Sequence, residues 1–310
     1  MRARDVVLAA ALVLAPVCLS ACGGGSGSSS AGTTAAPPAG SISALLNRPG
    51  PRVNAIAGSA DFAPGPVRLS FLLLDNEGGA VDRPTARVWV ARSDDAAPFT
   101  KTVATLEPIG VPGSEPATGD VTHIYVSHFR VPKPGIYTVV AEPIGGRQVQ
   151  GELHIQVRDH PQAPGVGSKA IASKTPTIAS SGGKLSELTT RIPPDRTLLR
   201  YSVADSLAAH APFVLVFATP KFCSSRTCGP VVDVVEAVAK TFARTPIRFI
   251  HVEIYKDNNP TKGYNRWVTD WHLPSEPWTF LVGRDGRIKA RFEGSVSAAE
   301  LSAAVRRTLL

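Results

Sequence analysis

Residues 213–230 read FVLVFATPKFCSSRTCGP, and this stretch decides how the second half of the chain is expected to fold. Its first five residues are apolar throughout, which is typical of a central strand covered on both faces. A polar loop with Cys223 and Cys228 follows, and apolar residues recur at helical spacing from Val231 onward. The stretch therefore predicts a buried strand that leads through a cysteine-bearing loop into an amphipathic helix.

Strands and helices are expected to alternate from this stretch to residue 310. We predict strands at 213–218, 247–255, 278–282 and 288–292, and helices at 231–242 and 298–309. In the first helix, apolar residues recur at positions i, i+3, i+4, i+7 and i+11. This spacing places them on one face, which indicates that the helix packs against a sheet.

The position of Cys223 favours redox chemistry. It follows a buried strand and precedes a helix, where the helix dipole and free backbone N–H groups favour thiolate, and Lys221 and Arg226 add positive charge. Thiolate is the nucleophile in disulfide exchange. Residues five apart in a continuous helix are about 7.5 Å apart along its axis, beyond the ~7 Å Cα limit for a disulfide. We therefore expect a loop between Cys223 and Cys228, with Pro230 at the first helical position.

Two motifs resemble those of the thioredoxin-like superfamily. One is the aromatic residue before Cys223, with Cys228 and a Gly-Pro pair near the helix start; the other is EPWTFLVGRDGRI at 276–288, which resembles the hairpin of TlpA-like extracytoplasmic thioredoxins. The resemblance implies a thioredoxin-like α/β fold over residues 191–310. It also implies a cis-proline at Pro277 that faces the reactive sulfur, and thiol-disulfide oxidoreductase activity. We expect Cys223, Cys228 and Pro277 to be the catalytic residues, with no cofactor.

The chain departs from the thioredoxin pattern in two respects. Four residues separate its cysteines where thioredoxins have two, and the acid that many thioredoxins bury beneath the disulfide corresponds to Val216. The segment Cys228-Gly229-Pro230-Val231 also aligns with the family's Cys-Gly-Pro-Cys, and in that alignment Cys228 attacks. We favour Cys223 as nucleophile and Cys228 as resolving residue, because the strand leads to Cys223 over the family's usual distance. Both assignments stay open at this point.

The N-terminus has the features of an export signal. Two arginines lie within the first four residues, an apolar run follows at 6–19, and the chain then reads Leu19-Ser20-Ala21-Cys22. The tetrapeptide resembles the bacterial lipobox, which implies a lipoprotein signal peptide at 1–21 and a lipid on Cys22. We therefore expect a chain anchored on the extracytoplasmic face of the cell membrane. Its expected partners are envelope proteins that carry thiols or disulfides, and nucleic acid is not expected.

The numbers of cysteines and methionines limit which disulfides and metal ligands the mature chain can have. Of four cysteines, Cys18 falls in the signal and Cys22 carries the lipid, so Cys223 and Cys228 form a natural disulfide pair in a compartment that permits disulfides. The sole methionine is Met1, which excludes methionine ligation of copper or haem in the mature chain. The formal net charge of +8 indicates either attraction to anionic lipids and wall polymers or a solvated basic surface.

Composition divides the rest of the chain. Residues 22–52 are small and polar and predict a flexible tether, and a second linker is expected at 159–190. Residues 53–158 predict an antiparallel sandwich, because short β-rich runs alternate with turn residues at 67–74, 86–91, 121–131, 136–141 and 148–157. The run PGIYTVV at 134–140 resembles the late strand of immunoglobulin-like domains. The expected fold class is thus multidomain, an all-β immunoglobulin-like sandwich followed by the α/β thioredoxin-like fold.

Other functions remain as alternatives to disulfide exchange. A structural disulfide would fit a non-catalytic envelope binding or scaffolding lipoprotein. A copper chaperone resembling the Sco type would use Cys223, Cys228 and a histidine, with His272 the first candidate and His251 the second. A thiol peroxidase is a further alternative. Zinc is not expected, because two thiols occur without paired histidines, and the primary expectation is that the site holds no metal.

Overall fold

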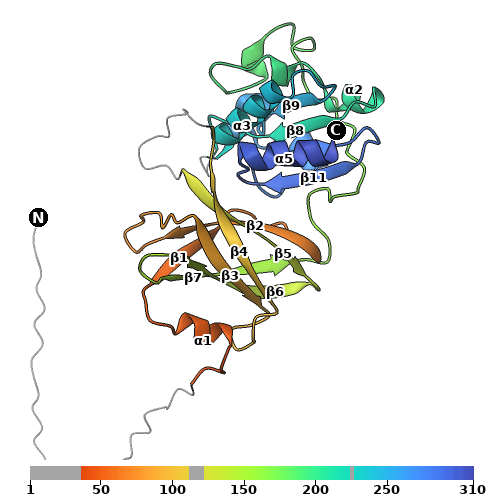
Figure 1. The fold of residues 1–310 in the computed structure, drawn as a ribbon. Helices are drawn as coiled ribbons and strands as arrows, with labels where there is room; N and C mark the ends of the chain where they lie inside the picture. The colour runs from red at the N-terminus through yellow and green to blue at the C-terminus, as the bar shows by residue number, and fades with distance from the viewer. Residues whose placement is uncertain (1–35, 112–121, 224–226) are drawn as a thin grey trace, which may run out of the picture. The chain divides into compact units, whose positions relative to one another are not determined.

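In the part of the chain that the structure describes, seven strands before residue 158 form one sheet that closes on itself. The computed structural model describes residues 36–111, 122–223 and 227–310. The strands, labelled in Figure 1, are β1 (Arg52–Ala57), β2 (Gly65–Leu74), β3 (Thr85–Ala91), β4 (Thr100–Pro108), β5 (His123–Val131), β6 (Gly135–Pro143) and β7 (Gln150–Val157). They pair in the order β1-β2-β5-β4-β3-β6-β7. Parallel pairing between β1 and β7 closes the barrel.

The predicted fold class, an immunoglobulin-like sandwich followed by an α/β thioredoxin-like fold, is wrong. A sandwich would divide the strands between two sheets with edges, whereas each strand from β1 to β7 has a hydrogen-bonded neighbour on both sides. Two strands that the prediction omitted complete the ring, since β1 joins β2 to β7 and β4 joins β3 to β5. The molecule is mostly this closed barrel, together with a small mixed sheet of four strands.

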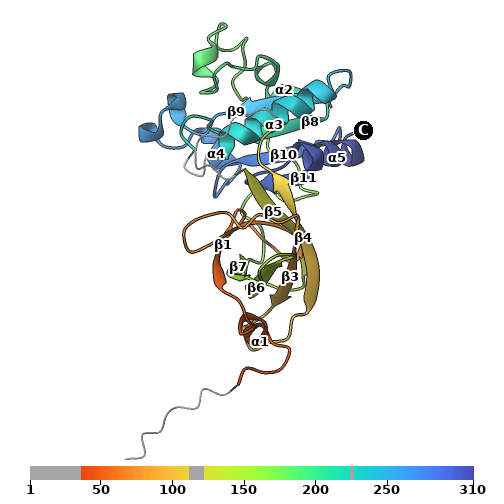
Figure 2. The ribbon, with the colours of Figure 1, turned by 60° about the vertical axis from the view of Figure 1, so that its left-hand side comes forward.

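Apolar side chains fill the interior of the barrel. Alternate residues of a strand face the same side, and in β2 those from Val67 to Leu73 are buried in one core cluster. The cluster includes Tyr125 and Tyr137, whose hydroxyl groups donate to the carbonyl oxygens of Val81 and Lys133 at 2.9 and 2.6 Å. The curved strands around this interior can be followed in Figure 2. The two buried tyrosines therefore keep their polar ends satisfied.

Part of the segment predicted as a tether is ordered. Helix α1 (Ile42–Leu46) begins after Ser41, whose hydroxyl accepts a backbone hydrogen bond from the first turn at 3.1 Å. Ile42 is fully buried in a cluster with Trp89 and Val140 of the barrel. The apolar residues of this short segment thus pack against the barrel. The predicted signal peptide and Cys22 lie outside the described residues.

The second sheet has the strand order β11-β10-β8-β9. Its strands are β8 (Phe213–Phe217), β9 (Arg248–Val252), β10 (Trp278–Val282) and β11 (Ile288–Glu293); the α-helices near it are α2 (Val203–Ala208), α3 (Cys228–Thr241), α4 (Arg266–Asp270) and α5 (Ala298–Thr308), with 3₁₀ turns at Leu185–Glu187, Thr197–Leu199, Lys256–Asn258 and Pro260–Lys262. The strands and helices predicted after residue 190 are confirmed, with shifts of a few residues at their ends. Across the described ranges, no helix has both the length and the apolar character that crossing a bilayer requires.

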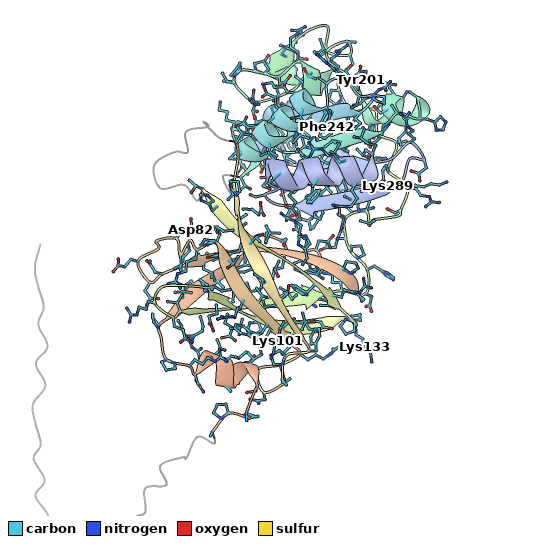
Figure 3. All side chains as sticks on the ribbon, viewed as in Figure 1. Asp82, Lys101, Lys133, Tyr201, Phe242 and Lys289 are labelled. Atoms are coloured by element: carbon cyan, nitrogen blue, oxygen red, sulfur yellow. The ribbon has the colours of Figure 1, made fainter. Side chains whose placement is uncertain are left out.

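Strand β8 is buried on both faces, as its apolar sequence predicts. Its even-numbered residues pack in a cluster with α3 and α5, and its odd-numbered residues pack in another with Trp271. Phe242, labelled in Figure 3, is buried directly after α3, and the guanidinium of Arg306 lies 5.4 Å from the centre of its ring. Packing on both sides therefore fixes the end of β8, where the cysteine loop starts.

Ion pairs connect the barrel to the second sheet, and residues 37–310 group as one compact unit. Arg68 of β2 forms a bidentate pair with Glu300 of α5, with both N···O distances 2.7 Å. Asp61 accepts a hydrogen bond from Arg291 of β11 at 2.9 Å, and the Asp61 side chain is 0% exposed. Glu293 at the end of β11 accepts the backbone N–H of Asp61 at 2.7 Å. Charged contacts thus hold the loop after β1 against β11.

Candidate redox site

The cysteine loop starts where β8 ends and finishes where α3 begins. Cys223 follows a turn in which the Phe222 N–H donates to the Thr219 carbonyl at 3.3 Å, and residues 224–226 lie outside the described ranges. Helix α3 begins at Cys228, so Pro230 is its third residue. The prediction that Pro230 is the first helical residue is wrong. A proline costs little there because the first four N–H groups of a helix have no partner within it.

The structure brings the two cysteines together. Their sulfur atoms lie within 4.8 Å of each other, and the Cys228 backbone N–H donates to the Cys223 sulfur at 3.3 Å. Cys223 is partly exposed, whereas Cys228 is fully buried. The structure has no bond between the two sulfurs, so the disulfide between them stays a prediction.

The two thiols differ in how readily they ionise. The hydrogen bond from the Cys228 thiol to the Cys223 sulfur, followed by burial and the charge of Cys223, raises the pKa of Cys228 well above its ordinary value. The Cys223 sulfur, in contrast, accepts an N–H at the start of a helix, which favours its thiolate. This asymmetry favours Cys223 as the attacking sulfur and Cys228 as the thiol that reacts second.

We expect iodoacetamide at pH 7 to modify Cys223 at least about tenfold faster than Cys228, since thiolate is the reactive form and the raised pKa of Cys228 keeps that residue a thiol. Burial of Cys228 adds to the difference. Mass spectrometry of peptides from the reduced, folded protein measures both rates, and the unfolded protein in urea is the control in which they converge. Equal rates in the folded protein would contradict the assignment.

A carboxylate that the sequence motifs did not identify lies beside the sulfurs. Glu276 directly precedes Pro277, and the peptide bond between them is cis, as the family resemblance implied. A carboxylate oxygen of Glu276 lies within 4.8 Å of both cysteine sulfurs. Within the described residues, Glu276 Oε2 is buried and makes no hydrogen bond. The available sequence signal was its place next to the proline expected to face the reactive sulfur.

Glu276 changes charge near neutral pH. Burial, followed by the charges of Cys223 and Glu253, raises the pKa of Glu276 to about 7. Glu253 lies just after β9 and is also buried. Its Oε1 accepts hydrogen bonds from the N–H and the hydroxyl of Thr190, at 2.6 and 2.9 Å. The site therefore contains two thiols and a carboxyl group that titrates in the physiological range.

The end of the predicted linker takes part in holding the cysteine loop. The Thr190 hydroxyl accepts the N–H of Lys221 at 3.1 Å. The next residue, Arg191, forms ion pairs with Asp233 and Glu236 of α3, at 2.9 and 2.5 Å. These contacts connect the segment at 190–191 to the loop before Cys223 and to the helix after Cys228.

Neither histidine predicted as a copper ligand joins this group. Among the described side chains, the cluster that contains both cysteines has Glu276 as its third member. His251 is buried with Nε2 3.0 Å from the Ala218 carbonyl oxygen, and His272 is exposed. Because soft ions such as Cu(I) prefer thiolate and imidazole to carboxylate, the arrangement favours thiol chemistry over the copper alternative.

The likeness of this chain to known proteins is distant. No family model matches the chain, and no curated protein does. Among solved structures, the chain is similar to a thiol:disulfide interchange protein of the thioredoxin family from Chlorobium tepidum TLS, with 12% sequence identity and a TM-score of 0.29. The match covers 49% of this chain and 100% of that chain. A TM-score this low does not place two chains in one fold.

Proposed function

We propose that the protein is a thiol-disulfide oxidoreductase in which Cys223 attacks and Cys228 resolves. The observation that carries the proposal is the asymmetric pair: a partly exposed sulfur that accepts a helix N-terminal N–H, within 4.8 Å of a buried thiol. Such a pair presents one nucleophile to a substrate and shields the second thiol until the first has reacted.

The proposed cycle transfers electrons only between sulfur atoms. In the reductive direction, the Cys223 thiolate attacks a substrate disulfide, and a mixed disulfide forms as the first substrate thiolate leaves. Cys228 then attacks the Cys223 sulfur, which forms the Cys223–Cys228 disulfide and releases the second substrate thiolate. The substrate gains two electrons, the cysteine pair loses two, and a dithiol reductant restores the pair. The cycle needs no cofactor.

We also propose that a lipid on Cys22 anchors the protein on the extracytoplasmic face of the cell membrane. The support is the Leu-Ser-Ala-Cys sequence at 19–22, which follows a short apolar run. Partners at this location are envelope proteins that carry thiols or disulfides, and nucleic acid is not among them.

The proposed function is tested by titrating the folded protein with glutathione redox buffers. We expect Cys223 and Cys228 to interconvert between dithiol and disulfide while circular dichroism stays constant, with a midpoint above about −300 mV, since buried structural disulfides lie below that value. Quenched alkylation and mass spectrometry measure the oxidised fraction.

A structural disulfide gives a different result in the same titration. In that case, the pair would resist reduction until the protein unfolds, and that outcome would overturn the proposed function. A protein that never forms the disulfide under oxidising buffers would overturn it as well.

A further inference from the structure

We propose that Glu276 accepts the proton of Cys228 when the mixed disulfide is resolved. This inference rests on the proposed thiol-disulfide exchange and adds a role for a residue outside the cysteine loop. The carboxylate oxygen of Glu276 lies within 4.8 Å of both sulfurs. One intervening water or a small rotation of the side chain closes such a distance to hydrogen-bond length, and catalytic hydrogen bonds commonly tighten when substrate binds.

Resolution requires a base because Cys228 is held as a thiol. Its side chain is fully buried, and burial is one of the causes that raise its pKa; burial still acts in the mixed disulfide, where Cys223 carries no charge. Only a thiolate attacks a disulfide. The position beneath the pair that would carry an acid in many thioredoxins is Val216, which packs in the same apolar cluster as Cys228. The proton must therefore pass to a group on another element.

Glu276 has the properties that this transfer requires. It reaches the sulfurs from the loop before β10, and its Oε2 is buried without a hydrogen-bond partner in the described part of the chain. In the dithiol form, its pKa of about 7 means that the carboxylate predominates above neutral pH and the protonated acid below it, and loss of the Cys223 charge in the mixed disulfide favours the carboxylate further. A base with a pKa near the working pH both accepts a proton and returns it.

The step balances in atoms and electrons. The Cys228 S–H bond breaks, and its proton moves to the Glu276 carboxylate. The Cys228 thiolate attacks the Cys223 sulfur, so the Cys223–Cys228 bond forms as the bond from Cys223 to the substrate sulfur breaks. The departing substrate thiolate takes the proton from Glu276. The carboxylate is regenerated, and the cysteine pair has lost the two electrons that the substrate disulfide gained.

The test follows the two phases of the reaction between reduced protein and 5,5′-dithiobis(2-nitrobenzoate) in a stopped-flow spectrophotometer. The first phase releases one thionitrobenzoate as Cys223 attacks, and the second releases another as Cys228 resolves the mixed disulfide. In the wild type, we expect the second-phase rate to rise with pH with a midpoint no higher than about 7, because the charge of Cys223 that helps raise the pKa of Glu276 in the dithiol is absent from the mixed disulfide. In Glu276→Gln, we expect that midpoint to disappear and the second-phase rate at pH 8 to fall about 10²-fold, the usual contribution of a positioned base.

Two matched variants separate proton transfer from a general charge effect. Glu253→Gln keeps an acceptor oxygen for Thr190 and removes the charge that helps raise the pKa of Glu276. We expect its second phase to remain and its midpoint to move to lower pH. Glu77→Gln, at an exposed position, should reproduce the wild-type profile. If Glu276→Gln does not fold, Glu276→Asp takes its place, and a pH-dependent second phase of reduced rate supports the assignment.

The contrary outcomes distinguish this inference from the proposed function. If the wild type completes both phases and Glu276→Gln, or Glu276→Asp in its place, keeps the wild-type rates and profile, Glu276 is not the acceptor, although disulfide exchange stands. Loss of the profile in Glu253→Gln assigns the proton to Glu253 and also overturns the inference. Failure of the wild type to release the second thionitrobenzoate at any pH overturns the inference and the proposed function together.

Discussion

Replacing Cys223 with serine is expected to reduce the turnover of insulin disulfides to the rate measured without protein. A serine hydroxyl is not ionised at neutral pH and does not replace a thiolate in disulfide exchange. The remaining thiol, Cys228, is fully buried, and burial both disfavours its thiolate and shields it from a substrate disulfide, so it does not substitute as the attacking group. Turbidity from the released insulin B chain, with dithiothreitol as the reductant, measures turnover.

Cys228→Ser should also lack turnover, but for a different reason that can be observed directly. Cys223 still attacks, and the reaction stops at a mixed disulfide that approaches one equivalent per protein chain. Mass spectrometry without reductant detects this species, and thermal unfolding shows whether each variant keeps its fold. If Cys223→Ser accumulates the mixed disulfide and Cys228→Ser does not, the roles of the two cysteines are reversed, as in the alternative alignment of Cys228-Gly229-Pro230-Val231.

Asp61→Ala is expected to lower the free energy of unfolding by about 3–5 kcal/mol, the usual result of removing one partner of a buried ion pair. The Asp61 carboxylate accepts hydrogen bonds from Arg291 at 2.9 Å and from the backbone N–H groups of Gln162 and Ala163 at 2.8 and 3.1 Å. Alanine at this position leaves the guanidinium and the two N–H groups without this hydrogen-bond acceptor. Urea unfolding followed by circular dichroism measures the change.

Asp285→Ala is the matched control for Asp61→Ala. Asp285 pairs with Lys289 at 2.7 Å, but the side chains are 48% and 35% exposed. Water screens exposed ion pairs, so they contribute little to stability, and Asp285→Ala should change the free energy of unfolding far less than Asp61→Ala. A similar decrease in the free energy of unfolding in both variants would show that burial does not determine how much Asp61 contributes to stability.

The sequence predicted local structure better than it predicted how the barrel strands pair. Alternation identifies which residues of β2 face inward, but inward residues look the same in a sandwich and in a barrel. The two fold classes differ here in β1 and β4, which the prediction omitted. Strand β1 falls at the edge of the assumed tether, and β4 alternates polar threonines with few large apolar residues. Their pairing depends on partners far along the chain, which local patterns do not encode.

The candidate site was predictable where its residues are close in sequence. The end of β8 could be inferred from the local pattern, and the start of α3 to within three residues; the cis peptide bond at Pro277 was implied by the family resemblance of the motif that contains it. Glu276 could not be assigned in this way, because its proximity to the sulfurs depends on how the loop before β10 meets the cysteine loop. Its raised pKa arises from burial and neighbouring charges, which are properties of the folded chain.

Glu293 connects the loop after β1 of the barrel to the loop before β10, which carries Glu276. One of its carboxylate oxygens accepts the N–H groups of Ala60 and Asp61 at 2.8 and 2.7 Å, and the other accepts the hydroxyl of Ser275 at 2.7 Å. Ser275 is the residue before Glu276. Contacts from the loop after β1 of the barrel therefore help to position the loop that carries Glu276. Cutting the chain between the two sheets would keep both cysteines but remove these contacts.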